Sequence, residues 1–443
     1  MDKKLSGKDT LVIGLMLFAL FFGAGNMIFP PSLGQAAGEN VWLVVLGFLI
    51  TGVGLPLLGV ISIGLSGSDV QSLSNRVHPL FGWLFPIILY LAIGPLFGIP
   101  RTGTVAYEMG VTPFLPDRFV DSTVSLFVYT LVFFGITFWL SLNPSKLVDT
   151  IGKVLTPALI LVLVMLSVKA FVTPMGSLQK PQEDYVEGAF FKGFLEGYLT
   201  MDTIAALVFG IVVINAVKSR GVTSQKEIAI VCTKAGLIAS VGLIFVYVSL
   251  AYLGATSVST LGYLDNGSAI LASSATVLFG PFGNIVLGLA ITFACLTTSV
   301  GLVSACGEYF SKILPRFSYN LIILFITLFS TIVANFGLSQ IISFSVPILV
   351  TIYPLAIVLI MLTFLHSTFK GAREVYVFSI TATASLSIID GLNAANIQLG
   401  NLNEFLNLYV PFFEFGVGWV VPAVVGGFVG WIVSRVKSKP ELV

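Results

Sequence analysis

Long apolar stretches, interrupted by short polar ones, run through this sequence from end to end. Of its 443 residues, 56% are hydrophobic and 10% are charged, and the mean hydropathy is +1.00. Soluble domains carry about a quarter charged residues, so this chain has too few charges to cover a surface in water. Lipid offers no partner to a backbone N–H or C=O group, so long apolar segments can cross it only as helices. We therefore expect an all-α polytopic membrane protein embedded in a lipid bilayer.

The lengths of the apolar stretches set the number of spans. A hydrocarbon core about 30 Å thick takes roughly 20 helical residues. By that measure the sequence predicts about 12 transmembrane helices in a single transmembrane domain over 1–443, with no inserted soluble domain. The predicted spans are 9–36, 41–66, 80–107, 121–142, 147–171, 188–217, 230–254, 281–310, 317–334, 339–365, 373–391 and 411–434.

The distribution of lysine and arginine predicts the orientation. If the N-terminus lies inside, most of the 22 basic residues fall at cytoplasmic ends of the predicted spans. Arg118, Lys169, Lys180 and Lys192 fall at outer ends, and Arg101 lies within a span. Cytoplasmic loops are enriched in basic residues, so this bias predicts that both termini are cytoplasmic.

Several classes of function are not expected. The net charge of +1 gives no indication of a nucleic-acid partner. Cys232, Cys295 and Cys306 lie in apolar runs, and no Cys/His spacing suggests a metal site or a disulfide framework. The sequence also lacks paired mid-membrane aspartates, a His-Glu-x-x-His motif and a repeated filter sequence. We expect neither an enzyme nor a channel, and no bound cofactor.

The first predicted span is interrupted near its middle by Gly23-Ala24-Gly25-Asn26. A helix that unwinds within lipid frees backbone groups, which must find partners. In transporters such breaks aim helical amides at an anionic substrate group and carbonyls at a cation. The alternative is close helix packing through small residues.

The sixth predicted span has a polar centre, running from Gly197 through Thr200, Met201 and Asp202 to Thr203. Its signal for a helix break is weaker, because no glycine or proline follows Gly197 before Gly210. An ionised carboxylate near mid-membrane is costly, so Asp202 is expected to bind a cation or an amine. The alternative is a structural ion pair with Arg101.

Two further polar features lie in spans three and eight. Arg101 could gate the outer side with Glu108, Glu196 or Asp202, or it could form a fixed packing pair. The adjacent hydroxyls of Thr297 and Thr298 could bind sodium. They could instead bond to a carbonyl one turn back in their own helix, as is common for these residues.

Four blocks of the sequence resemble the bacterial branched-chain amino acid:cation symporter family (BrnQ type). They are Phe21 to Pro31, Gly94 to Gly110, Gly197 to Gly210 and Ala294 to Leu302. The broken first span and the Thr-Thr pair of span eight are similar to a LeuT-type fold of the APC superfamily. That resemblance implies broken helices 1 and 6 and two inverted five-helix repeats, here 1–172 and 187–366, with two additional helices over 373–436.

The resemblance also implies a function. It predicts uptake of leucine, isoleucine and valine across the bacterial cell (inner) membrane by alternating access, with sodium as the coupling ion. A proton-coupled amino acid transporter of the same fold is the alternative. In some relatives of the wider fold a lysine in segment 5 replaces sodium, and Lys153 lies in that segment, near its cytoplasmic end.

The resemblance also assigns the residues of the binding sites, by their positions in the matching blocks. The sodium ligands implied are three carbonyls and two hydroxyls, from Ala19, Phe22, Ala294, Thr297 and Thr298. The substrate carboxylate would meet amides near Ala24, Gly25 and Asn26, and its amine would meet Thr200, Met201, Asp202 and Thr203. Phe209 and Leu302 are candidates for the wall of an aliphatic pocket. One departure concerns a second sodium site, which usually takes an asparagine from segment 7, because span 230–254 has none.

Overall fold

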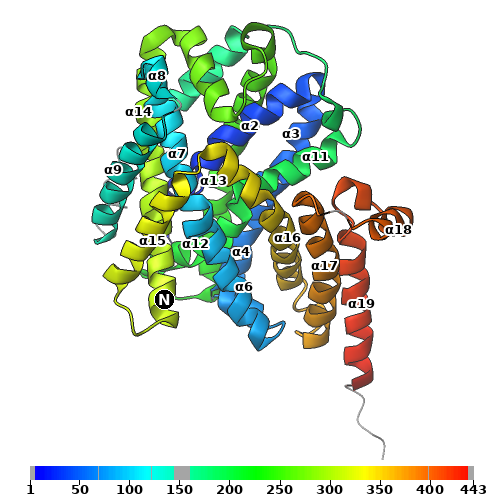
Figure 1. The fold of residues 1–443 in the computed structure, drawn as a ribbon. Coiled ribbons are helices and arrows are strands. Elements are labelled where there is room, and N and C mark those ends of the chain that lie inside the picture. The colour runs from blue at the N-terminus through cyan, green and yellow to red at the C-terminus, as the bar shows by residue number, and fades with distance from the viewer. Residues whose placement is uncertain (1–4, 68, 121, 144–159, 398, 438–443) are drawn as a thin grey trace, which may run out of the picture.

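The computed structural model describes residues 5–67, 69–120, 122–143, 160–397 and 399–437, and no strand occurs among them (Figure 1). The ribbon is a bundle of helices in which the beginning of α1 and the end of α19 both lie toward the lower end. The expected all-α class is therefore confirmed. Lys153 and the first half of span 147–171 lie outside the described residues.

The first half of the chain supplies seven principal helices and a shorter one at Ile160–Val172. They are α1 (Gly7–Phe21), α2 (Ala24–Ala37), α3 (Val41–Leu49), α4 (Leu55–Ser66), α6 (Pro79–Leu91), α7 (Gly98–Gly110) and α9 (Thr123–Ser141). Short helices α5 (Val70–Asn75) and α8 (Asp117–Val120) lie between them. Two π-helical segments, η2 (Ile50–Gly54) and η3 (Ala92–Leu96), interrupt the second and third predicted spans.

The second half begins with a bent pair, α11 (Ala189–Glu196) and α12 (Asp202–Lys218), joined by the 3₁₀ turn η6 (Gly197–Thr200). Four helices follow: α13 (Gln225–Leu261), α14 (Gly267–Ile313), α15 (Tyr319–Ala334) and α16 (Leu338–Phe364). The chain then adds α17 (Arg373–Ala394), α18 (Asn401–Tyr409) and α19 (Val420–Lys437).

A described helix lies within each of the 12 predicted spans, but fewer are long enough to cross a membrane alone. Eight described helices pass a test of length and hydropathy, or nine if the bent pair counts as one span. The difference lies in three predicted spans. Spans 147–171 and 317–334 are represented only by the shorter helices Ile160–Val172 and α15. The run Ala24–Ser66 counts once although it covers two predicted spans, which Gly38 separates with a φ of +49°.

Helices from the two halves of the chain pack on one another. Helix α2 packs on α13, α7 on α14, α3 on α11, and α4 on α12. The approach of α2 to α13 is very close, because a Cβ added at Gly34 would lie 2.0 Å from the carbonyl oxygen of Ala251. Such small-residue contacts are typical of membrane helices. The division into inverted repeats at 1–172 and 187–366 stays a prediction.

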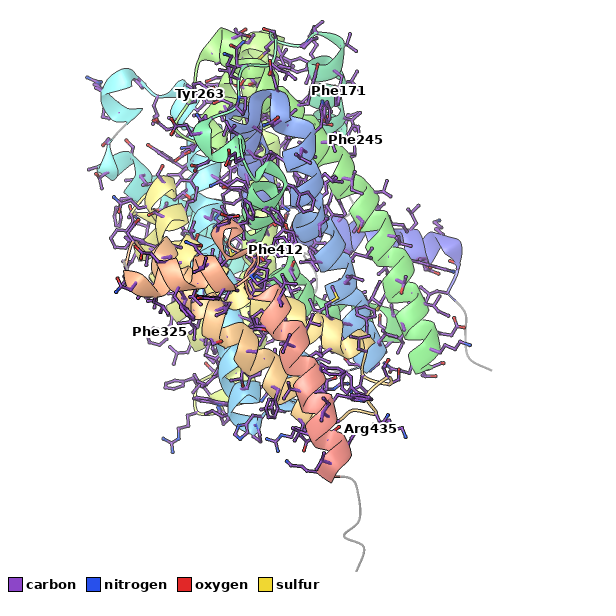
Figure 2. All side chains as sticks on the ribbon, turned by 90° about the vertical axis from the view of Figure 1, so that its right-hand side faces the viewer. Phe171, Phe245, Tyr263, Phe325, Phe412 and Arg435 are labelled. Atoms are coloured by element: carbon purple, nitrogen blue, oxygen red, sulfur yellow. The ribbon has the colours of Figure 1, made fainter. Side chains whose placement is uncertain are left out.

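Large apolar side chains cover the outside of the bundle (Figure 2). Phe245 and Phe325 are 41% and 61% exposed, and Trp139 is 69% exposed. Monomeric soluble proteins rarely expose so much contiguous apolar surface, whereas lipid requires it. Helices α17 and α19 pack on each other at one side of the bundle, and α16 packs on α17.

Candidate functional site

The first helix break lies between α1 and α2. The predicted interruption covered four residues, but the structure interrupts the helix only at Phe22 and Gly23. Ala24, Gly25 and Asn26 already form the first turn of α2, because the Asn26 side chain accepts a hydrogen bond from the Gly23 N–H at 2.9 Å. The first N–H groups of a helix have no partner within it, so this turn can receive an anion.

The second break lies between η6 and α12, where Met201 adopts the left-handed conformation with φ 65°. The two helices on either side of it meet at a bend of 42°. The hydroxyl of Thr200 accepts a hydrogen bond from the Asp202 N–H at 3.3 Å, across this break. Broken helices 1 and 6, as expected from the sequence, are confirmed.

The two breaks meet through Asn26 and Asp202. The Asn26 amide donates a hydrogen bond to the Asp202 carboxylate at 2.7 Å. The Tyr247 hydroxyl of α13 also contacts both, and it donates to the same carboxylate oxygen at 2.5 Å. All three side chains are buried. They connect α2, α12 and α13 at the centre of the bundle.

A small cavity of about 40 Å³, the central cavity, lies between the two breaks. Its walls include every predicted substrate residue except Thr203, together with Leu302. Thr203 is buried elsewhere, and its hydroxyl donates to the Thr51 carbonyl at 3.1 Å. A cavity of this size holds only a few water molecules, so the structure is closed around it.

The predicted sodium residues lie beside the first break. The Thr298 hydroxyl of α14 donates to the carbonyl of Phe22 at 3.4 Å, which joins α14 to the end of α1. The Thr297 hydroxyl donates to the Ala294 carbonyl at 2.8 Å, the local bond expected of a membrane threonine. Ala19 lies one turn before Phe22 in α1. The structure brings at least Phe22 and Thr298 together, and a role for the five residues in binding sodium stays a prediction.

Arg101 closes one side of the central cavity. Its guanidinium donates to the Leu199 carbonyl at 2.7 Å and to the Ser345 hydroxyl at 3.4 Å, and it lies 5.1 Å from the centre of the Phe29 ring. Across the described ranges, no carboxylate forms an ion pair with it. Arg101 therefore joins α7 to α2, η6 and α16 through neutral partners, and a role in gating stays a prediction.

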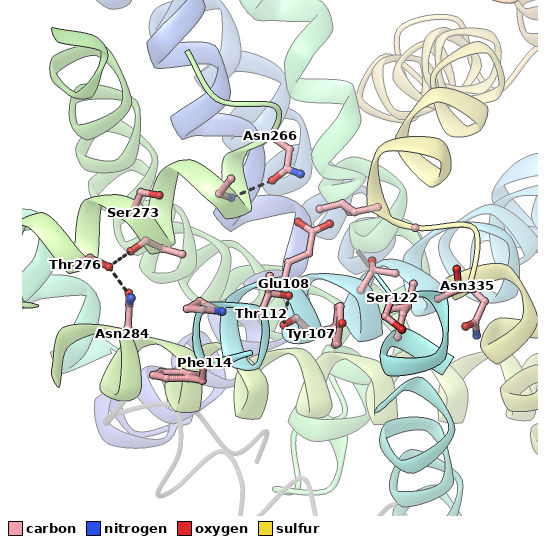
Figure 3. A pocket seen from close by; sticks show the side chains of 18 of the residues that line it. Tyr107, Glu108, Thr112, Phe114, Ser122, Asn266, Ser273, Thr276, Asn284 and Asn335 are labelled. Carbon is pink, nitrogen blue, oxygen red and sulfur yellow. Dashed lines mark hydrogen bonds between the residues drawn. The ribbon is translucent and has the colours of Figure 1, made fainter. Parts of the chain in front are cut away.

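Glu108, the predicted partner of Arg101, lies two turns further along α7 and lines a different space. This second cavity, the Glu108 cavity, has a volume of about 800 Å³ (Figure 3). Its walls come from α7, α9, α14 and the segment between α15 and α16. In this structure Glu108 and Arg101 line different cavities, and a gating role for the two residues stays a prediction.

Tyr247 is the site residue that sequence reasoning missed. Span 230–254 contains no asparagine. The tyrosine in the same span instead supplies the polar group opposite Asp202. A polar hydroxyl in the middle of an apolar span was the available signal, but only the packing of α13 on α2 shows where it points.

Comparison with known proteins gives the family. A model described as branched-chain amino acid transport protein matches residues 6–437. The chain is 56% identical to the branched-chain amino acid permease BraB of Bacillus subtilis (strain 168), over 98% of this chain and 97% of that protein. It is 43% identical to the branched-chain amino acid permease BrnQ of Escherichia coli (strain K12), over 96% and 95%.

Solved structures with the same fold are much more distant in sequence. Mhp1, a nucleobase-cation-symport-1 family transporter in a closed conformation, has a TM-score of 0.63 at 11% identity and covers 97% of this chain and 93% of its own. MhsT in complex with L-phenylalanine has a TM-score of 0.59 at 14% identity, over 99% and 100%. These likenesses confirm the expected LeuT-like fold. The chain belongs to the branched-chain amino acid transport protein family, whose members are multi-pass membrane transporters and not enzymes.

Proposed function

We propose that this protein imports leucine, isoleucine and valine across the bacterial cell membrane, coupled to sodium, by alternating access with both termini in the cytoplasm. The observation that carries the proposal is the closed central cavity between two helix breaks. Relatives that share about half of its residues over nearly the whole chain are named branched-chain amino acid permeases.

The central cavity offers a complementary group to each part of an amino acid zwitterion. The first turn of α2 presents N–H groups to a carboxylate. The buried Asp202 carboxylate presents an acceptor to an ammonium group. Phe21, Phe209 and Leu302 provide an apolar wall for an aliphatic side chain.

The volume of the cavity requires movement. At about 40 Å³ it is too small for leucine, so the helices around it must separate when substrate enters. The junctions at Gly23 and Met201 are the places where the helices can rotate, because the helical hydrogen-bond ladder is already interrupted there. A site at the crossing of two broken helices is the arrangement on which alternating access is built.

The coupling ion is proposed to lie beside the first break, between the Phe22 carbonyl and the Thr298 hydroxyl. Hard oxygen ligands of this kind suit sodium. For Thr298→Ala we expect the sodium concentration for half-maximal leucine uptake to rise about tenfold, since a ligand oxygen is lost. Thr298→Ser keeps the hydroxyl and serves as the matched control. An unchanged sodium response in Thr298→Ala removes this residue from the site.

Proton coupling is the second candidate, and Asp202 favours it. Along the described parts of the chain no basic side chain forms an ion pair with this buried carboxylate. A carboxylate inside a membrane protein is costly when ionised, so a proton or a cation could accompany it.

Uptake of labelled leucine into proteoliposomes tests both candidates. Sodium coupling predicts that replacing external sodium with choline abolishes accumulation, whereas an imposed pH gradient has no effect. Accumulation that continues in choline and follows the pH gradient would show that protons drive transport. Absence of leucine uptake under every gradient would contradict the proposed substrate.

A further inference from the structure

Two charged side chains line the central cavity, the Arg101 guanidinium of α7 and the Asp202 carboxylate at the start of α12. They are only 1% and 2% exposed. Within the described ranges, no ion pair joins the two side chains to each other or to a third residue. A buried charge without an oppositely charged partner is costly, so a ligand that carries both charges would stabilise this cavity.

The guanidinium of Arg101 has neutral partners only. It donates to the Leu199 carbonyl and to the Ser345 hydroxyl, and its Nε–H is buried without a hydrogen-bond partner. These contacts use two of the five N–H donors of an arginine. A neutral oxygen satisfies an N–H group but does not compensate the charge, whereas a carboxylate does both and accepts two N–H groups at once. The side chain therefore keeps an uncompensated positive charge.

This charge lies against the first turn of α2. A Cβ added at Gly25 would lie 3.1 Å from the Nη1 atom of Arg101. The N–H groups of that turn form the positive end of the α2 dipole. Two positive groups so close together repel each other unless an anion compensates them. The guanidinium also lies over the Phe29 ring of α2, and this cation–π contact holds it beside the turn.

The negative charge belongs to the second helix break. The Asp202 carboxylate accepts hydrogen bonds from the Asn26 amide and the Tyr247 hydroxyl, which are both neutral. A neutral amino acid, with an ammonium group and a carboxylate on one carbon, compensates both buried charges. An amine with the same side chain leaves Arg101 uncompensated, and the corresponding acid leaves Asp202 uncompensated. A site rejects an analogue strongly when binding leaves one of its buried polar groups unpaired.

We propose that Arg101 binds the α-carboxylate of the substrate together with the first turn of α2, and that the two isolated charges restrict transport to zwitterionic amino acids. This inference rests on the proposed function, because the ligand is the same amino acid in the same cavity. It makes Arg101 a substrate-binding residue and a determinant of specificity. A residue that acted only as a gate would control passage without distinguishing ligands by their carboxylate.

Two analogues of leucine test this assignment, because each lacks one charged group. 3-Methylbutylamine keeps the ammonium group and the side chain, and 4-methylpentanoate keeps the carboxylate and the side chain. A ligand that binds only the folded protein raises its Tm, so the dependence of Tm on ligand concentration gives an apparent dissociation constant. For the purified wild-type protein in sodium-containing buffer, we expect both analogues to bind about 100-fold more weakly than leucine.

For Arg101→Gln we expect the apparent dissociation constant of leucine to rise about 100-fold, because its carboxylate loses a charged partner. The constant for 3-methylbutylamine should change by less than about threefold, since this ligand has no carboxylate. Arg101→Lys keeps the charge but not the planar fork, and should recover about tenfold of the loss. Arg118→Gln, which replaces an exposed arginine of α8, is the matched control and should leave both constants unchanged.

The ratio of the two constants is measured on one protein preparation, so partial unfolding of a variant does not alter it. A wild-type ratio in Arg101→Gln overturns the assignment, and a lower kcat for uptake alongside it would identify a gate. Wild-type protein that binds 3-methylbutylamine as tightly as leucine also overturns it, and this measurement needs no variant. Wild-type protein that neither binds nor takes up leucine contradicts the proposed function instead, so the two failures are distinguishable.

Discussion

The two helix breaks differ in what makes each of them possible. At the first, Gly23 has φ −129°, a conformation that other residues also adopt. Its glycine is needed for space, because a Cβ there would lie 3.0 Å from the Thr298 methyl group. At the second break the positive φ belongs to Met201, which is not a glycine. The left-handed conformation costs about 1–2 kcal/mol in a residue with a side chain.

This difference explains why the local sequence predicts the first helix break more clearly than the second. Glycines occur at the first break because side chains of other helices approach it closely. A Cβ at Gly23 would lie 3.0 Å from Thr298, and a Cβ at Gly25 would lie 3.1 Å from Arg101. The second break is held by tertiary contacts, among them the hydrogen bonds of Asp202 to Asn26 and Tyr247. The residues at the first break themselves favour an interruption of the helix, whereas the second break depends on contacts with residues of other helices.

The largest expected effect is that of removing the charge at the second break. For Asp202→Asn we expect kcat/KM for leucine uptake to fall about 100-fold, because the proposed buried pair between this carboxylate and the substrate ammonium group would be lost at a cost of about 3 kcal/mol. Proteoliposome uptake measures it. Asp390→Asn is the matched control, a buried aspartate of α17 that lines neither cavity, and it should retain near-wild-type uptake. Equal losses in both variants would assign the effect to folding.

An intermediate effect is expected where the two breaks touch. A Cβ at Gly25 would lie 3.1 Å from the Arg101 guanidinium and 3.2 Å from the Thr200 carbonyl. For Gly25→Ala we expect leucine uptake to fall about tenfold, since crowding of this kind costs about 1–3 kcal/mol. Gly135→Ala is the control, because nothing lies within 4 Å of its added Cβ. Wild-type uptake by Gly25→Ala would mean that the breaks move independently.

The smallest expected effect concerns the third helix that holds the second break. Tyr247→Phe keeps the ring against Phe48, at 5.2 Å between ring centres, but removes the hydroxyl that contacts Asp202 and Asn26. We expect uptake to fall about threefold to tenfold, because the Asn26 amide still donates to the Asp202 carboxylate when the hydroxyl is lost. Tyr252→Phe on the same helix should behave as the wild type. A loss as large as that of Asp202→Asn would make Tyr247 an equal partner in binding.

Much of the fold could be predicted from the sequence. Low charge and long apolar runs require helices in lipid, and each predicted span contains a described helix. Most of the predicted substrate residues do line one cavity. Thr203 is the exception, because the rotation of α12 directs its hydroxyl to the Thr51 carbonyl. Glu108, a gating candidate, lines a separate cavity because it lies two turns from Arg101 along α7.

The sequence by itself determined that this chain lies in a membrane, that its first helix is broken and that a carboxylate lies buried in its sixth span. Those properties follow from local chemistry, because each depends on how one segment meets lipid. Only the tertiary structure decided that Met201 takes the left-handed conformation, that Tyr247 and Asn26 bind Asp202, and that Arg101 bonds to neutral groups. These features depend on where separate helices meet. A buried polar group is stabilised by its partner on another helix, and the local sequence around the group does not specify that partner.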